Sequence, residues 1–221
     1  MDADAALASA EPDTRGRIVA TAERLFRQIG YQKTTVADIA KALRMSPANV
    51  YRFFDSKKAI NEVVAERLMR EVEGALEAIA CQKAPAAVRL RDMIATMHRM
   101  NAALYTDELR MHEMVERALS ESWQVVHGHL ERKNAIFQRV VGDGIETGEF
   151  ASTDPVIASR CVQVALIRFC HPALLVQCAQ EPGPSLDQMT EFILAGLGWR
   201  AELPAKKRTE PRQSKANSRA V

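Results

Sequence analysis

Cysteines, aromatic residues and long apolar runs are all scarce in this chain of 221 residues. The four cysteines form no CxxC pair and lack metal-finger spacing, so we expect reduced thiols, no metal site and no cofactor. The first residues have neither the basic segment nor the apolar run of a signal peptide. The most apolar stretch, 162–180, is interrupted by polar residues, which argues against a membrane span. These absences favour a cytoplasmic protein with no membrane partner.

Aromatic residues make up only 5% of the chain, and no stretch keeps the two-residue alternation of a strand for long. Apolar residues instead recur at steps of three and four, so we expect an all-α fold. Three helices fall within the first 55 residues, and later ones are expected at 57–80, 86–104, 107–119, 121–147, 155–180 and 185–198. Pro172 is expected to kink or interrupt the helix 155–180 near Phe169.

The net charge of +2 hides an uneven distribution along the chain. Residues 13–60 carry ten basic and four acidic side chains, whereas residues 61–199 carry thirteen basic and nineteen acidic ones. A basic block on an acidic body indicates a polyanionic partner for one part only, with nucleic acid as the first candidate.

A short helix with strong start signals lies near the end of the basic block. Ser46 supplies a hydroxyl cap and Pro47 takes the first helical position. The helix before it begins with Thr35-x-x-Asp38, which resembles a capping box. Three helices at this spacing are typical of a helix-turn-helix, whose third helix enters the DNA major groove. Its inner face is predicted to carry Val50, Phe53 and Phe54, and its outer face Ala48, Asn49, Tyr51 and Arg52.

At these residues the chain resembles the TetR family of bacterial transcriptional repressors. The resemblance covers about residues 14–65 and lies in Gly30-Tyr31, Thr34-Thr35-Val36, Ile39-Ala40, Ser46-Pro47, Val50-Tyr51-Arg52-Phe53-Phe54 and Ser56-Lys57-Lys58. It implies about nine helices, with an N-terminal helix-turn-helix domain joined by a long helix to a C-terminal helical domain for effector binding and dimerisation. It also implies a homodimer that represses transcription from a double-stranded DNA operator and is released by a small-molecule effector.

This plan divides the chain into four parts. We expect a disordered segment over 1–12, the DNA-binding domain over 13–65 and the effector-binding and dimerisation domain over 66–199. The polar, basic sequence over 200–221 predicts a disordered tail.

The resemblance also assigns roles to single residues. The family's phosphate contacts would fall on Thr34 or Thr35, Tyr51 and Lys58, and its base-reading positions on Arg44, Ala48, Asn49 and Arg52. Lys57, at the start of the long helix, is a further candidate, although both lysines could simply be solvated.

One departure from the family pattern concerns the turn before the third helix. The family commonly has a glycine where this chain has Arg44, and glycine permits a left-handed turn. An arginine in that conformation would cost about 1 kcal/mol. A DNA contact could offset this cost, although a slightly different turn is the simpler alternative.

The C-terminal body carries weaker signals. The apolar stretch 155–180 would form a four-helix dimer seam with 185–198. Arg168 within that stretch needs a partner, which could be a buried glutamate, the other subunit or an anionic ligand. Residues that mix soft apolar surface with hydrogen-bonding groups are predicted to line an effector site: Met97, His98, Asn101, Tyr105, His112, Trp123, His127, Arg168 and His171.

Two other classes of protein compete with this interpretation. A helical enzyme is disfavoured because the chain has no glycine-rich phosphate loop, no GxSxG, no HExxH and no paired carboxylates at a telling spacing. Cys170 and His171 are adjacent, so on a helix they diverge by about 100° and cannot form a nucleophile–base pair. A helical interaction module without specific DNA binding would explain the body but not the basic block.

Overall fold

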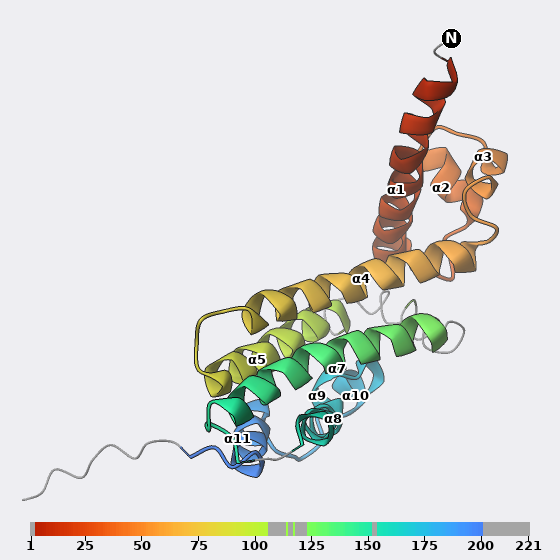
Figure 1. Ribbon diagram of the computed structural model, residues 1–221. Helices are drawn as coiled ribbons and strands as arrows, with labels where there is room; N and C mark the ends of the chain where they lie inside the picture. The colour runs from red at the N-terminus through yellow and green to blue at the C-terminus, as the bar shows by residue number, and fades with distance from the viewer. Residues whose placement is uncertain (1–2, 106–113, 115–116, 118–122, 152–153, 201–221) are drawn as a thin grey trace, which may run out of the picture.

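The computed structural model describes residues 3–105, 114, 117, 123–151 and 154–200. All regular structure in these residues is helical, as Figure 1 shows, which confirms the all-α fold class. The helices are α1 (Ala3–Ile29), α2 (Val36–Ala42), α3 (Pro47–Tyr51), α4 (Lys57–Ala80), α5 (Ala86–Tyr105), α7 (Trp123–Glu146), α8 (Pro155–Ala165), α9 (Ile167–Cys170), α10 (Pro172–Gln177) and α11 (Leu186–Gly196). No described helix is long and apolar enough to cross a membrane.

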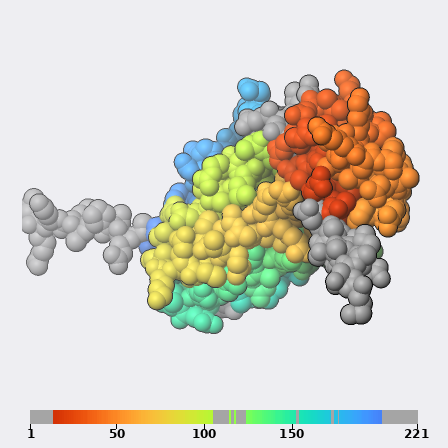
Figure 2. All heavy atoms as spheres, turned by 90° about the horizontal axis from the view of Figure 1, so that it is seen from above, coloured from red at the N-terminus to blue at the C-terminus, as the bar shows by residue number. Residues whose placement is uncertain are grey.

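Helix α4 joins two parts of the molecule. Helices α1–α3 form an N-terminal unit at one end of α4, and α4 then runs along α5 and α7 in the body (Figure 1). Figure 2 shows the N-terminal unit as a separate lobe, in red and orange, beside the yellow and green body. The helix starts sharply because the Ser56 hydroxyl accepts a hydrogen bond from the Ala59 amide. The predicted helix over 57–80 is therefore confirmed.

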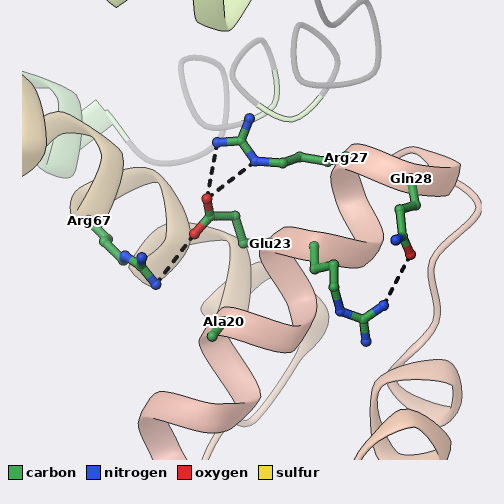
Figure 3. Close-up of a pocket in the computed structure, with 6 residues that line it drawn as sticks. Ala20, Glu23, Arg27, Gln28 and Arg67 are labelled. Carbon is green, nitrogen blue, oxygen red and sulfur yellow. Dashed lines mark hydrogen bonds and ion pairs between the residues drawn. The ribbon is translucent and has the colours of Figure 1, made fainter.

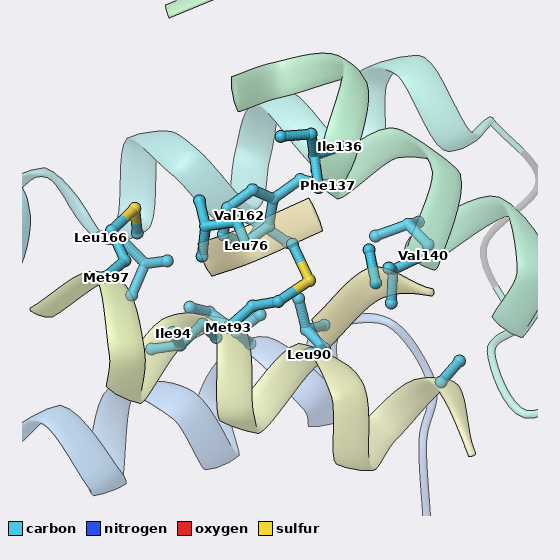
Figure 4. Packing of buried hydrophobic residues seen from close by; sticks show 14 of the residues in the cluster. Leu76, Leu90, Met93, Ile94, Met97, Ile136, Phe137, Val140, Val162 and Leu166 are labelled. Atoms are coloured by element: carbon cyan, nitrogen blue, oxygen red, sulfur yellow. The ribbon is translucent and has the colours of Figure 1, made fainter. Parts of the chain in front are cut away.

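Each part has its own apolar core. The core of the N-terminal unit gathers Ile18, Ala22, Phe26, Ile39, Val50, Phe54, Ile60 and Val64, together with Met114 and Leu175 from the body. The core of the body lies between α4, α5, α7, α8 and α9, where the side chains interdigitate (Figure 4). It includes Leu76, Leu90, Met93, Ile94, Met97, Ile136, Phe137, Val140, Val162 and Leu166. Burial of a side chain of this size contributes about 1.5–3 kcal/mol, so these cores hold the helices in place.

The predicted helix over 155–180 is divided into α8, α9 and α10, and its expected interruption at Pro172 is confirmed. One break, at His171, follows from Pro172, because proline disfavours helical dihedrals in the residue before it, and His171 is extended with ψ of 129°. The sequence predicts this break. A second break at Leu166 separates α8 from α9 with no glycine or proline to mark it.

The ends of the chain also differ from expectation. Helix α1 begins at Ala3 and so includes most of the segment 1–12 that was expected to be disordered. Its alanine-rich sequence favours continuation of the helix that is packed from Ile18 onward. Of the predicted helix 107–119 only Met114 and Arg117 are described, and the basic tail beyond Arg200 lies outside the described residues.

Candidate DNA-binding interface and effector region

Helix α3 presents a polar side to solvent because its apolar side is buried. The Ser46 hydroxyl accepts from the Asn49 amide at 3.3 Å and caps the helix. Val50 and Phe54 are buried in the core of the N-terminal unit, whereas Phe53 is only partly buried. The predicted outer face is Ala48, Tyr51 and Arg52, which are exposed, and Asn49, which is half-buried. Tyr51 keeps 50% of its surface accessible, so its ring does not belong to the core.

The two threonines before α2 have different surroundings. Thr35 is exposed and forms a capping box with Asp38, as predicted, which holds the pKa of the Asp38 carboxyl below its usual value. Thr34 is fully buried, and its hydroxyl donates to the Gly30 carbonyl at 2.8 Å. The Thr34 side chain therefore cannot contact DNA phosphate. Of the two alternatives, only Thr35 is on the surface.

The turn between α2 and α3 keeps the left-handed conformation. Arg44 has φ of 56°, and among the described residues other than glycine it alone has a positive φ. The Arg44 amide still donates to the Lys41 carbonyl at 3.1 Å, and the exposed side chain projects beside α3. The alternative of a different turn is wrong, and Arg44 bears a strain of about 1 kcal/mol.

Lys57 and Lys58 are neighbours with unlike roles. The Lys57 ammonium donates to the carbonyls of Tyr31 at 2.9 Å and Thr34 at 3.0 Å, and lies 4.3 Å from the centre of the Tyr31 ring. Burial lowers the pKa of Lys57, and the nearby Arg117 adds to this effect. Lys57 therefore binds the α1–α2 loop, which corrects its assignment as a DNA contact. Lys58 is about half exposed and makes only a long ion pair with Glu62, at 3.9 Å.

A carboxylate on α1 connects the N-terminal unit to α4. Figure 3 shows Glu23 between Arg27, at 3.0 Å, and Arg67 of α4, at 3.5 Å. These residues line a hollow of about 340 Å³ together with Ala20, Arg24 and Gln28. The pairing between Glu23 and Arg67 crosses from α1 to α4, so it constrains the angle between them.

The body also touches the N-terminal unit directly. Asn61 of α4 is buried, and its amide donates to the Met114 carbonyl at 3.3 Å. The Gln32 amide oxygen accepts from two nitrogens of Arg117, at 3.0 and 3.2 Å. The loop that holds Lys57 is therefore in contact with the body as well.

Several predicted effector residues come together at the break between α9 and α10. His98 Nδ1 lies 2.8 Å from the Phe169 carbonyl, and the Asn101 amide donates to the Cys170 carbonyl at 3.1 Å. These contacts satisfy carbonyls that the interrupted helix leaves unpaired. His171 Nδ1 is buried without a partner among the described residues, and Met97 is fully in the core.

Other predicted effector residues do not join this group. The Arg168 guanidinium donates to the carbonyls of Cys178 at 3.1 Å and Glu181 at 2.9 Å, and approaches the exposed Glu181 carboxylate at 3.8 Å. Its partners are thus none of the three that were expected. His127 is exposed on α7. For Tyr105 and Trp123 only the backbone is described, and His112 lies outside the described residues.

Sequence reasoning missed a polar cluster between α4 and α7. Glu73 is buried on α4, and its two carboxylate oxygens contact His129 Nδ1 at 2.7 Å and Arg132 Nε at 2.8 Å. Burial opposes ionisation of Glu73, yet the hydrogen bonds from Arg132 and His129 lower its pKa. Glu73 directly follows Val72 of the apolar stripe, which was the one signal that placed it near the core. Among the described residues no group of three or more histidine, cysteine or acidic side chains could hold a metal ion.

Comparison with known families covers both parts of the molecule. The family described as bacterial regulatory proteins of the tetR family matches residues 18–64. A second family, described as the tetracyclin repressor-like C-terminal domain, matches residues 86–185. This chain belongs to the TetR family of regulators.

A curated relative matches this TetR-family chain over a short segment only. The biofilm operon icaADBC HTH-type negative transcriptional regulator IcaR of Staphylococcus aureus is 44% identical over 48 residues. That match spans 22% of this chain and about a quarter, 26%, of the curated relative.

Solved structures support the fold alone. A TetR/AcrR-family regulator from Thermobifida fusca superposes with a TM-score of 0.58 at 24% identity, covering 86% of this chain and 100% of that one. SmeT, the repressor of a Stenotrophomonas maltophilia multidrug efflux pump, gives 0.59 at 20% identity over 81% of this chain and 86% of its own. FadR of Bacillus halodurans gives 0.60 at 16% identity over 83% and 93%. As a member of this family, the protein is a DNA-binding regulator and not an enzyme.

Proposed function

We propose that the protein is a cytoplasmic repressor that binds a two-fold symmetric DNA operator as a homodimer and leaves it when a small molecule enters the body. The observation that carries this proposal is the exposed polar side of α3. Tyr51 and Arg52 are exposed there, as are Arg44 and Lys58 nearby in the sequence, while Val50 is buried in the core. Cations, amides and hydroxyls on one exposed helix face suit the major groove.

The exposed side chains near α3 fall into two groups, according to whether they can contact base edges or phosphates of DNA. Arg44, Asn49 and Arg52 can form hydrogen bonds with base edges, and Ala48 can contact a thymine methyl group. Tyr51, Thr35 and Lys58 suit phosphate oxygens, because a hydroxyl or an ammonium positions the protein without reading sequence.

The homodimer is supported by an uncovered apolar surface on α8 and α11. Val164 and Phe192 are about 70% exposed, at 70% and 71%, and Ile157 is 54% exposed. A groove of about 410 Å³ lies between the two helices and is lined by Ile157, Cys161 and Phe192 among others. Apolar surface of this kind marks an interaction site. A second copy seated on the same surface creates a two-fold axis and hence a near-palindromic operator.

Release follows from coupling between the body and the N-terminal unit. An effector shifts the protein only through different affinities for its DNA-bound and free arrangements. Helix α4 and the contacts Asn61–Met114 and Gln32–Arg117 offer routes by which the body alters the angle of α3. A coupling of about 1–3 kcal/mol would weaken operator binding by about 5- to 150-fold.

Selection of DNA from a random pool tests the proposal. We expect a near-palindromic site, and Arg52→Ala should weaken binding to it by about 1–3 kcal/mol and relax one base preference. Arg139→Ala, at a half-exposed arginine of α7 in the body, is the matched control and should bind as the wild type does. Folded Tyr51→Ala and Arg52→Ala variants that bind the selected site normally would contradict the assignment of α3. Failure to enrich any site would favour an interaction module instead.

A further inference from the structure

The polar cluster between α4 and α7 contains more positive than negative charge. Glu73 supplies one carboxylate, and Arg132 already pairs with it. His129 also contacts Glu73, but burial lowers the pKa of His129, so it is neutral near pH 7. Glu66, which also acts on Arg132, is itself paired with Arg70 at 2.8 Å. Glu73 and Glu66 are therefore already paired with Arg132 and Arg70, and the cluster contains one more cation, Lys133.

Lys133 is that remaining cation. It lies on α7, one turn after His129, and its ammonium has no hydrogen bond or ion pair within the part of the chain that the structure describes. Loss of solvent lowers its pKa, although the side chain keeps some accessible surface. A partly buried cation that has no ion-pair partner among the described residues is costly for a folded protein. Such a group persists where it serves a function.

The surroundings of Lys133 limit what its partner can be. Lys133 interacts electrostatically with Cys170 and with Glu73. Burial raises the pKa of the Cys170 thiol to about 11, so the thiol is neutral and does not balance the charge. Next to it, His171 Nδ1 is buried and unpaired among the described residues, while Asn101 and His98 are occupied with the carbonyls of Cys170 and Phe169. A ligand with one anionic group and an otherwise apolar structure fits this arrangement.

Arg168, the anchor that the sequence suggests, is already engaged. Its guanidinium is held by the carbonyls of Cys178 and Glu181 and by the Glu181 carboxylate at the surface. An acidic effector at Arg168 would have to displace these partners, whereas at Lys133 it would meet a cation with none.

We propose that Lys133 anchors the effector in the body and that the effector is a small apolar carboxylate. This inference rests on the proposed function, because it names the chemistry of the ligand that releases the operator. The carboxylate would pair with the Lys133 ammonium, and its apolar part would lie on the side chains around the α9–α10 break.

Matched pairs of carboxylates and their neutral amides test this directly. The probes are benzoate and benzamide, octanoate and octanamide, and indole-3-acetate and indole-3-acetamide, added to the full-length protein in thermal-shift and calorimetric titrations. A charge-assisted hydrogen bond should make at least one carboxylate bind about 10- to 100-fold more tightly than its amide. If every carboxylate binds no better than its amide, the inference is overturned.

Variants then locate the anchor. Lys133→Met, which keeps the length and apolar stem of the side chain, should abolish the preference for the carboxylate, and Lys133→Arg should retain part of it. Arg168→Met should leave the preference unchanged, as should Lys83→Met at an exposed lysine. Removal of the unpaired buried cation should also raise the melting temperature of ligand-free Lys133→Met. A preference that survives Lys133→Met but disappears in Arg168→Met would overturn the assignment.

Operator binding separates this inference from the function on which it rests. The carboxylate that binds the wild type should release the selected DNA from the wild type and not from Lys133→Met. A protein that binds its operator but shows no carboxylate preference would remove only the inference about Lys133. A protein that selects no DNA would remove the proposed function, whatever the carboxylates do.

Discussion

The N-terminal unit and the body satisfy their polar side chains over different distances. In the N-terminal unit, Thr34 donates to Gly30, four residues away, and Ser46 accepts from Asn49, three residues away. In the body, Glu73 pairs with His129 and Arg132, which are 56 and 59 residues away. Local contacts form the N-terminal unit and leave one face of α3 open, whereas the polar interior of the body depends on how distant helices pack. The exposed face of α3 is therefore shaped mainly by local contacts, while the polar interior of the body is assembled from distant ones.

The largest loss of operator affinity is expected from a change in the exposed apolar surface of α8 and α11, where we propose the dimer contact. Phe192→Asp places a charge on each copy in the middle of the proposed seam of α8 and α11, and an unpaired buried charge costs several kcal/mol. We expect a monomer by sedimentation at micromolar concentration and a loss of operator affinity of more than about 100-fold, corresponding to several kcal/mol. Val88→Asp, at an exposed apolar residue of α5 that keeps 44% of its surface accessible against 71% for Phe192, is the control and should remain dimeric. A dimeric Phe192→Asp would place the interface elsewhere.

A pair of neighbouring lysines tests a long-range contact of the N-terminal unit, between Lys57 and the α1–α2 loop. Lys57→Met removes donors to the Tyr31 and Thr34 carbonyls, so it should destabilise the unit by about 1–3 kcal/mol in denaturant unfolding. Lys58→Met should leave stability within about 0.5 kcal/mol of wild type. It should instead reduce the salt dependence of operator binding by about one unit of slope. The opposite pattern, in which Lys57→Met flattens the salt dependence without loss of stability, would reverse the two roles.

Acid should weaken the body more than the N-terminal unit. Because burial lowers the pKa of His129 from its ordinary value of 6.5, the unfolded chain binds this proton more readily than the folded one. The contribution of His129 to stability is therefore present above pH 6.5 and is lost as the pH falls. Glu73, whose pKa is lowered from 4.5, adds a second loss at still lower pH.

Melting temperatures at pH 7.5 and 5.5 check this expectation. His129→Gln should show a smaller decrease than the wild type between these values, whereas His127→Gln, on the exposed side of α7, should decrease as the wild type does. Equal decreases in all three proteins would show that His129 does not control the acid sensitivity.

The smallest effect is expected at the strained turn of the N-terminal unit. Arg44→Gly should relieve the left-handed strain and raise stability by up to about 1 kcal/mol, while operator affinity falls because a cation beside α3 is lost. Arg44→Asn, which tolerates the same conformation, separates the two effects: it should be nearly as stable as glycine but should not restore affinity. An Arg44→Gly variant that binds the selected site with full affinity would show that the strain has no function in DNA binding.

Sequence reasoning succeeds where the determining contacts are local. The caps at Thr35 and Ser46, the start of α4 after Ser56 and the break at His171 follow from residues within a few positions of one another. Short-range signals of this kind need no knowledge of tertiary packing. They also place the family signature, so the outer face of α3 was predicted residue by residue.

Sequence reasoning fails where a side chain pairs with a residue that lies far away in the sequence. Thr34 and Lys57 resemble surface residues in the sequence, yet Thr34 is buried and Lys57 binds a loop 23–26 residues earlier. Arg168 was expected to need a buried glutamate, the other subunit or a ligand, but its partners are the Cys178 and Glu181 carbonyls, 10 and 13 residues later in the chain.

The sequence by itself determined that this protein is an all-helical regulator of the TetR family whose basic residues are concentrated in the block 13–60. Helical period, caps and the motif spacing are all encoded within short windows of the chain. Only the tertiary structure decided which cations are paired: Arg168 with carbonyls, Arg132 with Glu73, and Lys133 with no hydrogen-bond or ion-pair partner among the described residues. The reason is that apolar packing over the whole body determines which helices are neighbours. The neighbouring helices in turn determine which buried charges can pair.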